Sequence, residues 1–335
     1  MTKAATAMTS NMSALLRLIR HMLCAGVMTI VTAGCSSWIY DDLSGCPQEL
    51  VFHFYRQTPC ETQPYYPANV RELRVFAFNE NNVLTEQYTL SDQTLRGDYR
   101  FTTRFDHQGT FTFVAWGAEN FSDYHIGELQ TGVTTFDQLT LSLRQQSVGQ
   151  GGKLSPLYFS EQPVPLCRCN PTDMGTYSDT VSLNLQELTN RINLTVYGLD
   201  ASHDYRIFIE DRNAVYDFTG QPVAGQPGIE YTSPQDRDGS VLRCRFTTLK
   251  LAEQQGTRLV VYDVTLSREV FSTLLVDDLI MYRGAFGEPP YSHECDHDFN
   301  VVLFLQRGDD STPTYMAVQA VVNDWNVLKR IVNPY

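Results

Sequence analysis

Short runs in which apolar and polar residues alternate cover the chain from residue 49 onward. Their period of two, their content of Phe, Val, Thr and Tyr, and the turn residues between them predict antiparallel strands with one buried face. Residues 79–82 (NENN) and 96–98 (RGD) predict hairpin turns between such strands. The runs of this first series are LVFHFY (50–55), ELRVFAF (72–78), YRFTTRF (99–105) and TFTFVAW (110–116).

The middle of the chain is less regular. The segment TTFDQLTLSLR (134–144) fits either a short helix that begins at Thr135 or another strand, and we favour the strand. Three prolines and the pair Cys167 and Cys169 lie between residues 161 and 179. Such a composition predicts a boundary between two domains.

A second series of strand-like runs begins at residue 181 with VSLNLQELTNRINLTVYGL (181–199), which has a predicted break at 187–190. Many short strands separated by polar turns favour two packed sheets in each half. We therefore predict an all-β chain with two β-sandwich domains in tandem. The N-terminal domain with its linker is expected at 49–180, and the C-terminal domain at 181–335. The later runs are YRIFIE (205–210), VLRCRFTTLKL (241–251), RLVVYDVTL (258–266), EVFSTLLV (269–276), FNVVLFLQR (299–307) and YMAVQAVVNDWNVLKRIV (315–332).

The start of the chain has the layout of a secretory signal peptide. Arg17 and Arg20 precede an apolar run at 22–31, and three small residues then lead into Cys35. This ending looks like a bacterial lipobox, in which the chain is cut after Gly34 and the cysteine is acylated. An ordinary signal peptide and a membrane-spanning anchor are the alternatives, but about ten apolar residues are too few for a bilayer, which needs about twenty.

Acylation would divide the N-terminal part into a signal peptide (1–34) and a lipidated tether (35–48). We expect Cys35 to carry a diacylglycerol and a further acyl chain, which together give stable anchoring, and no other cofactor. Removal of the signal peptide takes away three cations and no acid, so the formal charge falls from −13 to −16. This charge argues against nucleic acid as a partner and against binding of an anionic membrane by charge.

Six cysteines would remain besides Cys35, and an even number in an exported chain permits disulfides with fifteen possible pairings. Cys244 and Cys295 fall in the same predicted domain, and we name them as a possible pair. The six are Cys46, Cys60, Cys167, Cys169, Cys244 and Cys295.

The segment HECDHD (293–298) is the best candidate for metal chemistry. On an extended strand His293, Cys295 and His297 would share one face and could bind zinc, which would support a metal-assisted hydrolase. A structural zinc normally takes four ligands, however, and no second Cys/His cluster is evident. We therefore expect no metal here, and either a disulfide or a free thiol at Cys295. Because GxSxG and HExxH motifs are also absent from the sequence, we predict no catalytic residues and a protein that is not an enzyme.

Four stretches of the chain together resemble the FimB-type anchor subunits of the type V fimbriae of Bacteroidales. Members of that family are outer-membrane lipoproteins with two tandem transthyretin-like, Greek-key β-sandwich domains, and they hold the fimbrial shaft at its base and limit its length. The resemblance therefore implies a non-enzymatic pilus anchor on the cell surface, acylated at Cys35 after cleavage behind Gly34. The stretches are CSSWIYDDLSGCP (35–47), LYFS (157–160), ELTNRINLTVYGL (187–199) and VVNDWNVLKRI (321–331).

The expected partners are the outer membrane, through the lipid, and one or more fimbrial shaft subunits. An unpaired sheet edge offers backbone donors and acceptors to an incoming strand, so strand complementation is one way for a shaft subunit to bind. An alternative function is a surface lipoprotein that binds glycans through exposed aromatic residues, for which Trp38, Trp116 and Trp325 are the candidates.

Overall fold

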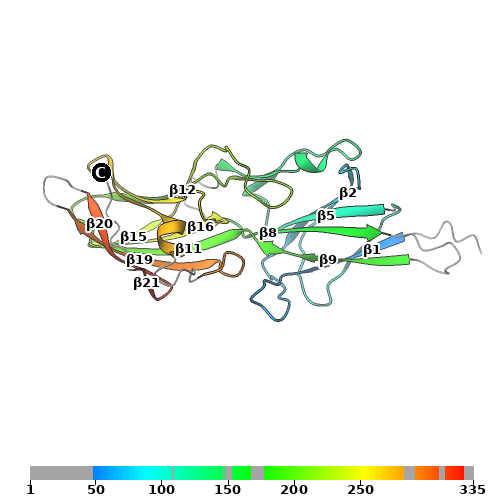
Figure 1. The fold of residues 1–335 in the computed structure, drawn as a ribbon, viewed down its shortest axis with the longest axis horizontal. Helices are drawn as coiled ribbons and strands as arrows, with labels where there is room; N and C mark the ends of the chain where they lie inside the picture. The colour runs from blue at the N-terminus through cyan, green and yellow to red at the C-terminus, as the bar shows by residue number, and fades with distance from the viewer. Residues whose placement is uncertain are drawn as a thin grey trace, which may run out of the picture. The chain divides into compact units, whose positions relative to one another are not determined.

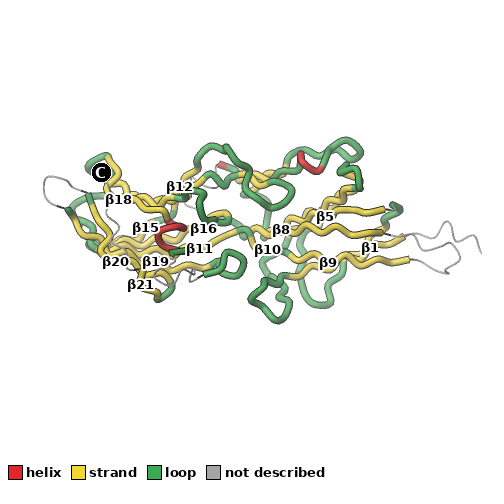
Figure 2. The backbone as a smooth tube through the Cα atoms, in the orientation of Figure 1, coloured by secondary structure: helices red, strands yellow, loops and turns green. Residues whose placement is uncertain are grey.

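A computed structural model describes residues 48–107, 109–145, 147, 153–166, 177–282, 291–308 and 314–327. Strands and loops make up nearly all of this part of the chain (Figure 1, Figure 2). The chain divides into a small compact unit (1–49, 104–106 and 168–178) and a large unit that holds the rest. The packing described below concerns the large unit.

The first strands form two sheets, β4-β1-β9 and β10-β8-β5-β2-β3. Alternate residues of β1 are buried, as the sequence pattern predicts, and Phe52 meets Phe113 of β5 edge to face at 5.4 Å between ring centroids. Trp116 of β5 is fully buried, and its ring centroid lies 4.8 Å from that of Phe159 of β8. The strands are β1 (Gln48–Tyr55), β2 (Glu72–Phe78), β3 (Leu84–Leu90), β4 (Phe101–Arg104), β5 (Gly109–Ala118), β8 (Leu157–Leu166), β9 (Tyr177–Asn184) and β10 (Gln186–Glu187).

The later strands form a six-stranded sheet, β15-β16-β11-β19-β20-β21, and a four-stranded sheet, β14-β12-β17-β18. β11 runs parallel to β19 and antiparallel to β16. The strands are β11 (Thr189–Tyr197), β12 (Tyr205–Asp211), β14 (Ile229–Thr232), β15 (Gln235–Asp238), β16 (Val241–Leu249), β17 (Arg258–Asp263), β18 (Arg268–Leu274), β19 (Asp298–Arg307), β20 (Tyr315–Val322) and β21 (Trp325–Val327).

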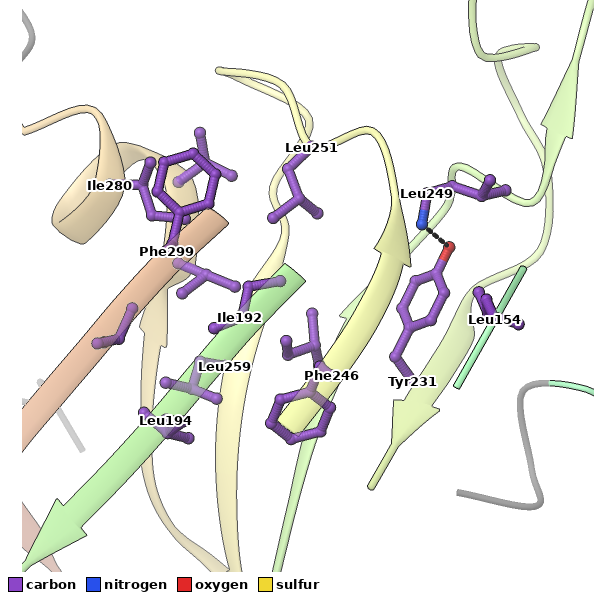
Figure 3. Close-up of a cluster of buried hydrophobic side chains, with 14 of the residues drawn as sticks. Leu154, Ile192, Leu194, Tyr231, Phe246, Leu249, Leu251, Leu259, Ile280 and Phe299 are labelled. Carbon is purple, nitrogen blue, oxygen red and sulfur yellow. Dashed lines mark hydrogen bonds between the residues drawn. The ribbon is translucent and has the colours of Figure 1, made fainter. Parts of the chain in front are cut away.

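Side chains from both of these sheets fill one apolar core (Figure 3). Ile192 of β11 and Phe246 of β16 come from the six-stranded sheet, and Leu259 of β17 comes from the four-stranded sheet. The buried hydroxyl of Tyr231 accepts a hydrogen bond from the backbone N–H of Leu249, at 3.3 Å, and donates one to an Asn213 side chain, at 2.7 Å. The hydroxyl of Tyr231 is thereby satisfied, as its burial requires.

A fifth, small sheet joins residues from the two predicted domains. It contains β6 (Tyr124–Ile126), β7 (Leu141–Leu143) and β13 (Val215–Tyr216), in the order β13-β7-β6. The predicted boundary between residues 180 and 181 falls inside β9, which pairs with β1. Beyond the boundary, the end of β9 and the whole of β10 therefore still belong to the sheets of the first strands. The division into two domains stays a prediction.

The all-β prediction is confirmed, and two finer expectations are decided as well. The run at 181–199 is interrupted at Leu185 and Leu188, so the break expected at 187–190 is met only at Leu188, and β11 already begins at Thr189. The segment 134–144 is not one strand, since a 3-10 helix, η2 (Phe136–Gln138), precedes β7. The side chain of Gln138 accepts a hydrogen bond from the backbone N–H of Thr135, at 2.9 Å, which satisfies a donor at the start of that turn.

The pairing of Cys244 with Cys295 is wrong, because Cys295 forms a disulfide with Cys60 instead, with 6.0 Å between the two Cα atoms. Cys244 lies opposite Leu194 on the core side of β16 with 2% of its surface exposed, and burial raises the pKa of its thiol to about 12. A thiol in the middle of a core cannot reach a cysteine in a surface turn. Cys46, Cys167 and Cys169 lie outside the described residues.

Two histidines lie within two residues of Cys295 in the sequence, and His293 is partly buried whereas His297 is buried. His297 is 5% exposed, and neither of its ring nitrogens finds a hydrogen-bond partner among the described residues. Burial lowers the pKa of both His293 and His297 below the ordinary value of 6.5. For His297 the charge of Glu187 opposes this lowering of the pKa, whereas the charges of Arg56, Lys250 and Arg191 add to it. Both imidazoles are therefore neutral in the folded protein near pH 7.

We predict that replacing both cysteines of the disulfide with Ser lowers the free energy of unfolding by about 2–5 kcal/mol, because the bond closes a long loop in the unfolded chain. The loop spans a sequence separation of 235 residues. Urea denaturation of the Cys60→Ser/Cys295→Ser protein measures the loss, with Cys244→Ala as a control for removal of a thiol that is not cross-linked. An unchanged denaturation midpoint in the double variant would contradict the assigned bond.

We also predict that stability falls as the pH drops from 7 to 5. Unfolding lets His293 and His297 regain their ordinary pKa, so the unfolded chain binds more protons than the folded one in this range. The stability contributed by each neutral imidazole is thus present above pH 6.5 and decreases below it, by at most about 1.4 kcal/mol per pH unit. His297→Phe should flatten the pH profile of urea midpoints, whereas replacing the exposed His125 with Gln should not. Equal slopes for the two variants would contradict this account.

Candidate functional site

The disulfide between Cys60 and Cys295 forms the centre of a polar cluster that we call the disulfide junction. It consists of the loop after β1 (56–61), the connection between β9 and β10, Lys250 and the turn before β19 (291–297). A pocket of about 470 Å³ lies within it. Its lining residues are Gln57, Thr58, Pro59, Asn184, Gln186, Glu187, Lys250 and Glu294.

Hydrogen bonds hold the loop that carries Cys60 in place. The backbone groups of Arg56 and Tyr65 exchange two hydrogen bonds of 2.7 Å, and the guanidinium of Arg56 donates to Glu61 at 3.0 Å. The side chain of Asn184 accepts from the backbone N–H of Gln57 and donates to its carbonyl oxygen, both at 2.8 Å. The loop is therefore fixed at its base and to the end of β9.

The turn that carries Cys295 is held by its own short-range hydrogen bonds. The backbone N–H of Ser292 donates to the carboxylate of Asp296, at 2.8 Å, and the backbone N–H of Asp296 donates back to the carbonyl of Ser292, at 2.8 Å. Regular strand structure begins only at Asp298. HECDHD is thus a turn followed by the first residue of a strand, and the expectation of an extended strand with His293, Cys295 and His297 on one face is wrong.

These residues do not assemble into a metal centre in the described part of the chain. The sulfur of Cys295 is bonded to Cys60, so it is not available as a thiolate ligand. Within the described part of the chain, no group of three or more His, Cys, Asp and Glu side chains is placed to hold a metal ion. The chemistry that the junction provides is a covalent cross-link surrounded by hydrogen bonds.

Arg191 connects the junction to the six-stranded sheet. Its guanidinium donates to both carboxylate oxygens of Asp298, at 2.6 and 2.9 Å, and also to Glu187. The hydrogen bonds from Arg191 hold the pKa of Asp298 below its usual value, so this carboxylate is charged at neutral pH. Because Arg191 and Asp298 are opposite each other in the parallel pairing of β11 and β19, their ion pair fixes the register at the start of both strands.

The other candidates from the sequence fall into three groups. Gly34, Cys35 and Trp38 lie outside the described residues, so acylation stays a prediction. Trp116 is fully buried, so it cannot contact a glycan, and its inclusion among the exposed aromatics is wrong. Trp325, at the start of the edge strand β21, is 63% exposed.

No helix in the described part of the chain has the length and apolar character required to cross a bilayer.

Cys60 is the residue of the junction that sequence reasoning missed. It lies in the first series of strands, far from Cys295 in the chain, and no spacing pattern links the two. Only the even number of cysteines pointed to a disulfide, and that number left all pairings open.

Comparison with known proteins identifies the family. Residues 43–329 match the family model of the fimbrillin-A associated anchor proteins Mfa1 and Mfa2. The chain is 31% identical over 301 residues to the minor fimbrium anchoring subunit Mfa2 of Porphyromonas gingivalis, covering 88% of this chain and 89% of the relative.

Solved structures agree with this match. The fold is similar to that of the fimbrial anchor protein Mfa2 from Porphyromonas gingivalis, with a TM-score of 0.74 and 28% identity over 85% of this chain and 100% of the other. A candidate polysaccharide-binding protein from Bacteroides thetaiotaomicron shares the fold, with a TM-score of 0.69 and 22% identity over 85% of this chain and 99% of the other. The resemblance to fimbrial anchor subunits is confirmed, and the chain belongs to the family of fimbrillin-A associated anchor proteins.

Proposed function

We propose that this protein is a non-enzymatic fimbrial anchor, fixed to the outer membrane by acyl chains on Cys35 and joined to the fimbrial shaft through its folded part. The observation that carries the proposal is the family match over residues 43–329, which includes nearly all of the chain that follows the lipobox-like segment. The minor fimbrium anchoring subunit Mfa2 of Porphyromonas gingivalis, whose name states the anchoring role, is 31% identical to this chain.

The position of Cys35 supports lipid anchoring. Residues 36–47 separate it from β1, and they include polar and turn residues that suit a spacer. Two or more acyl chains bind a bilayer stably, whereas a single chain binds only marginally. Asp41 and Asp42 close behind the lipid fit an acidic signal that directs a lipoprotein to the outer face of the membrane.

The edges of the sheets are the natural places for a shaft subunit to bind. β3, β18 and β21 each end a sheet in the strand order of the described chain, and an edge strand offers unpaired backbone groups to a partner. An anchor that occupies the base of the shaft would also terminate growth at that end, which accounts for a role in limiting shaft length. The protein would then be located on the cell surface as part of the fimbrium.

We predict that Cys35→Ala abolishes incorporation of a clickable palmitate analogue and releases the protein, together with attached shafts, into the medium. Cys46→Ala removes a cysteine from the same tether and should leave labelling and retention unchanged. In-gel fluorescence of the labelled protein and immunoblots of the cell and medium fractions measure both effects. Labelling of Cys35→Ala at the level of the unchanged protein would disprove the acylation site.

Glycan binding is the second candidate function, and the exposure of Trp325 is the observation that favours it. Exposed aromatic rings can stack on sugar faces, and a Trp that is 63% exposed makes few contacts within its own fold. If glycan binding is the function, Trp325→Ala should reduce retention of the purified protein on immobilised polysaccharide and leave the number of fimbriae per cell unchanged. Equal retention of both proteins would remove this alternative.

A further inference from the structure

The disulfide shortens the covalent path through the protein. Cys60 follows shortly after β1, and Cys295 lies just before β19. The bond therefore closes a loop with a sequence separation of 235 residues, which contains every strand from β2 to β18. Only the tether and β1 lie before the loop, and only β19, β20 and β21 follow it in the described chain.

We propose that the bond between Cys60 and Cys295 carries mechanical tension from the membrane tether directly into the six-stranded sheet, and that the shaft's pull leaves the anchor through the β19–β21 segment. This inference rests on the proposed function, because it requires a lipid at the N-terminus and a shaft at the other end. It adds a route for the force, which anchoring alone does not specify.

The connectivity of the chain gives the first argument. Tension applied between the tether and any residue after Cys295 follows the shortest covalent path, which runs along β1, across the two sulfur atoms and into β19. The strands within the loop are not in series with this path. They can remain folded under load, because the covalent bond prevents their two ends from separating.

The bracing of both half-cystines gives the second argument. On one side, Gln57 is bonded to Asn184 at the end of β9, and Arg56 is paired with Glu61. On the other side, Ser292 and Asp296 close the turn around Cys295. A cross-link between two flexible loops would stretch before it transmitted force, whereas these hydrogen-bonded turns transmit it at once.

The place of β19 in its sheet gives the third argument. β19 is hydrogen-bonded to β11 on one side and to β20 on the other, and the two oxygens of Asp298 at its first residue bind Arg191 of β11. Tension that enters at the start of β19 and runs along the strand loads many ladder hydrogen bonds together. A force that peeled the strand away from one end would instead break them one after another.

Single-molecule stretching of the mature chain, held by peptide tags at both ends, tests the route. The loop contains about 80 nm of extended chain at about 3.4 Å per residue. We expect the unchanged protein not to release this length until a reductant is added. We expect the Cys60→Ser/Cys295→Ser protein to release it without reductant, and to unfold at a lower force than the unchanged protein. Release of the full length without reductant, or equal unfolding forces for the two proteins, would overturn the proposal.

A shear assay on living cells tests whether the route matters. We expect cells with Cys60→Ser/Cys295→Ser to carry a normal number of shafts at rest and to lose them at least tenfold faster under flow. Leu73→Ala is the matched control, because it creates a cavity beneath β2, inside the loop, and destabilises the fold without cutting the route. We expect this variant to retain its shafts as the unchanged protein does.

The possible outcomes separate the inference from the function on which it rests. If the double variant retains its shafts under flow, or if Leu73→Ala loses them equally fast, the route is wrong and anchoring stands. If cells that lack the whole protein keep firmly attached shafts, anchoring itself is wrong. If the double variant does not reach the surface, a mild reductant applied to cells with the unchanged protein replaces it, and the same comparison under flow decides.

Discussion

The covalent bond between Cys60 and Cys295 is the constraint on which the arrangement of this protein most depends. It joins the loop after the first strand to the turn before β19, and all strands from β2 to β18 lie between these two points. Hydrophobic burial packs the sheets against one another, but it is non-directional and roughly proportional to area. The disulfide adds a link that a momentary loss of packing does not break.

Charged and polar groups around this bond also hold neighbouring strands together. Arg191 binds Asp298 and Glu187, so one guanidinium links β10, β11 and β19 where these strands begin or end. The buried imidazole of His297 is tolerated because it is neutral near pH 7. A junction with this composition is suited to hold elements together, and the sulfur of Cys295 is committed to the cross-link.

The family relationship and the physical structure support the same description of the protein. A fimbrial anchor needs a membrane attachment and a body that keeps its shape while a long filament pulls on it. Paired strands in sheets provide such a body, since the force is shared among many backbone hydrogen bonds. The acidic composition is compatible with this role, because the proposed contact with the membrane is made by lipid and not by basic side chains.

The sequence by itself determined the fold class, most of the strand positions and the family, because apolar residues with a period of two have few alternatives to a half-buried strand. It also predicted an interruption of the run at 181–199, although β11 already begins at Thr189, within the break expected at 187–190. The sequence could not determine the partner of Cys295, because pairing depends on which loops meet in space, and Cys60 lies 235 residues away. For the same reason it could not show that Cys244 and Trp116 are buried. Only the tertiary structure decided these points, since burial and cross-linking depend on contacts between residues that are distant in the chain.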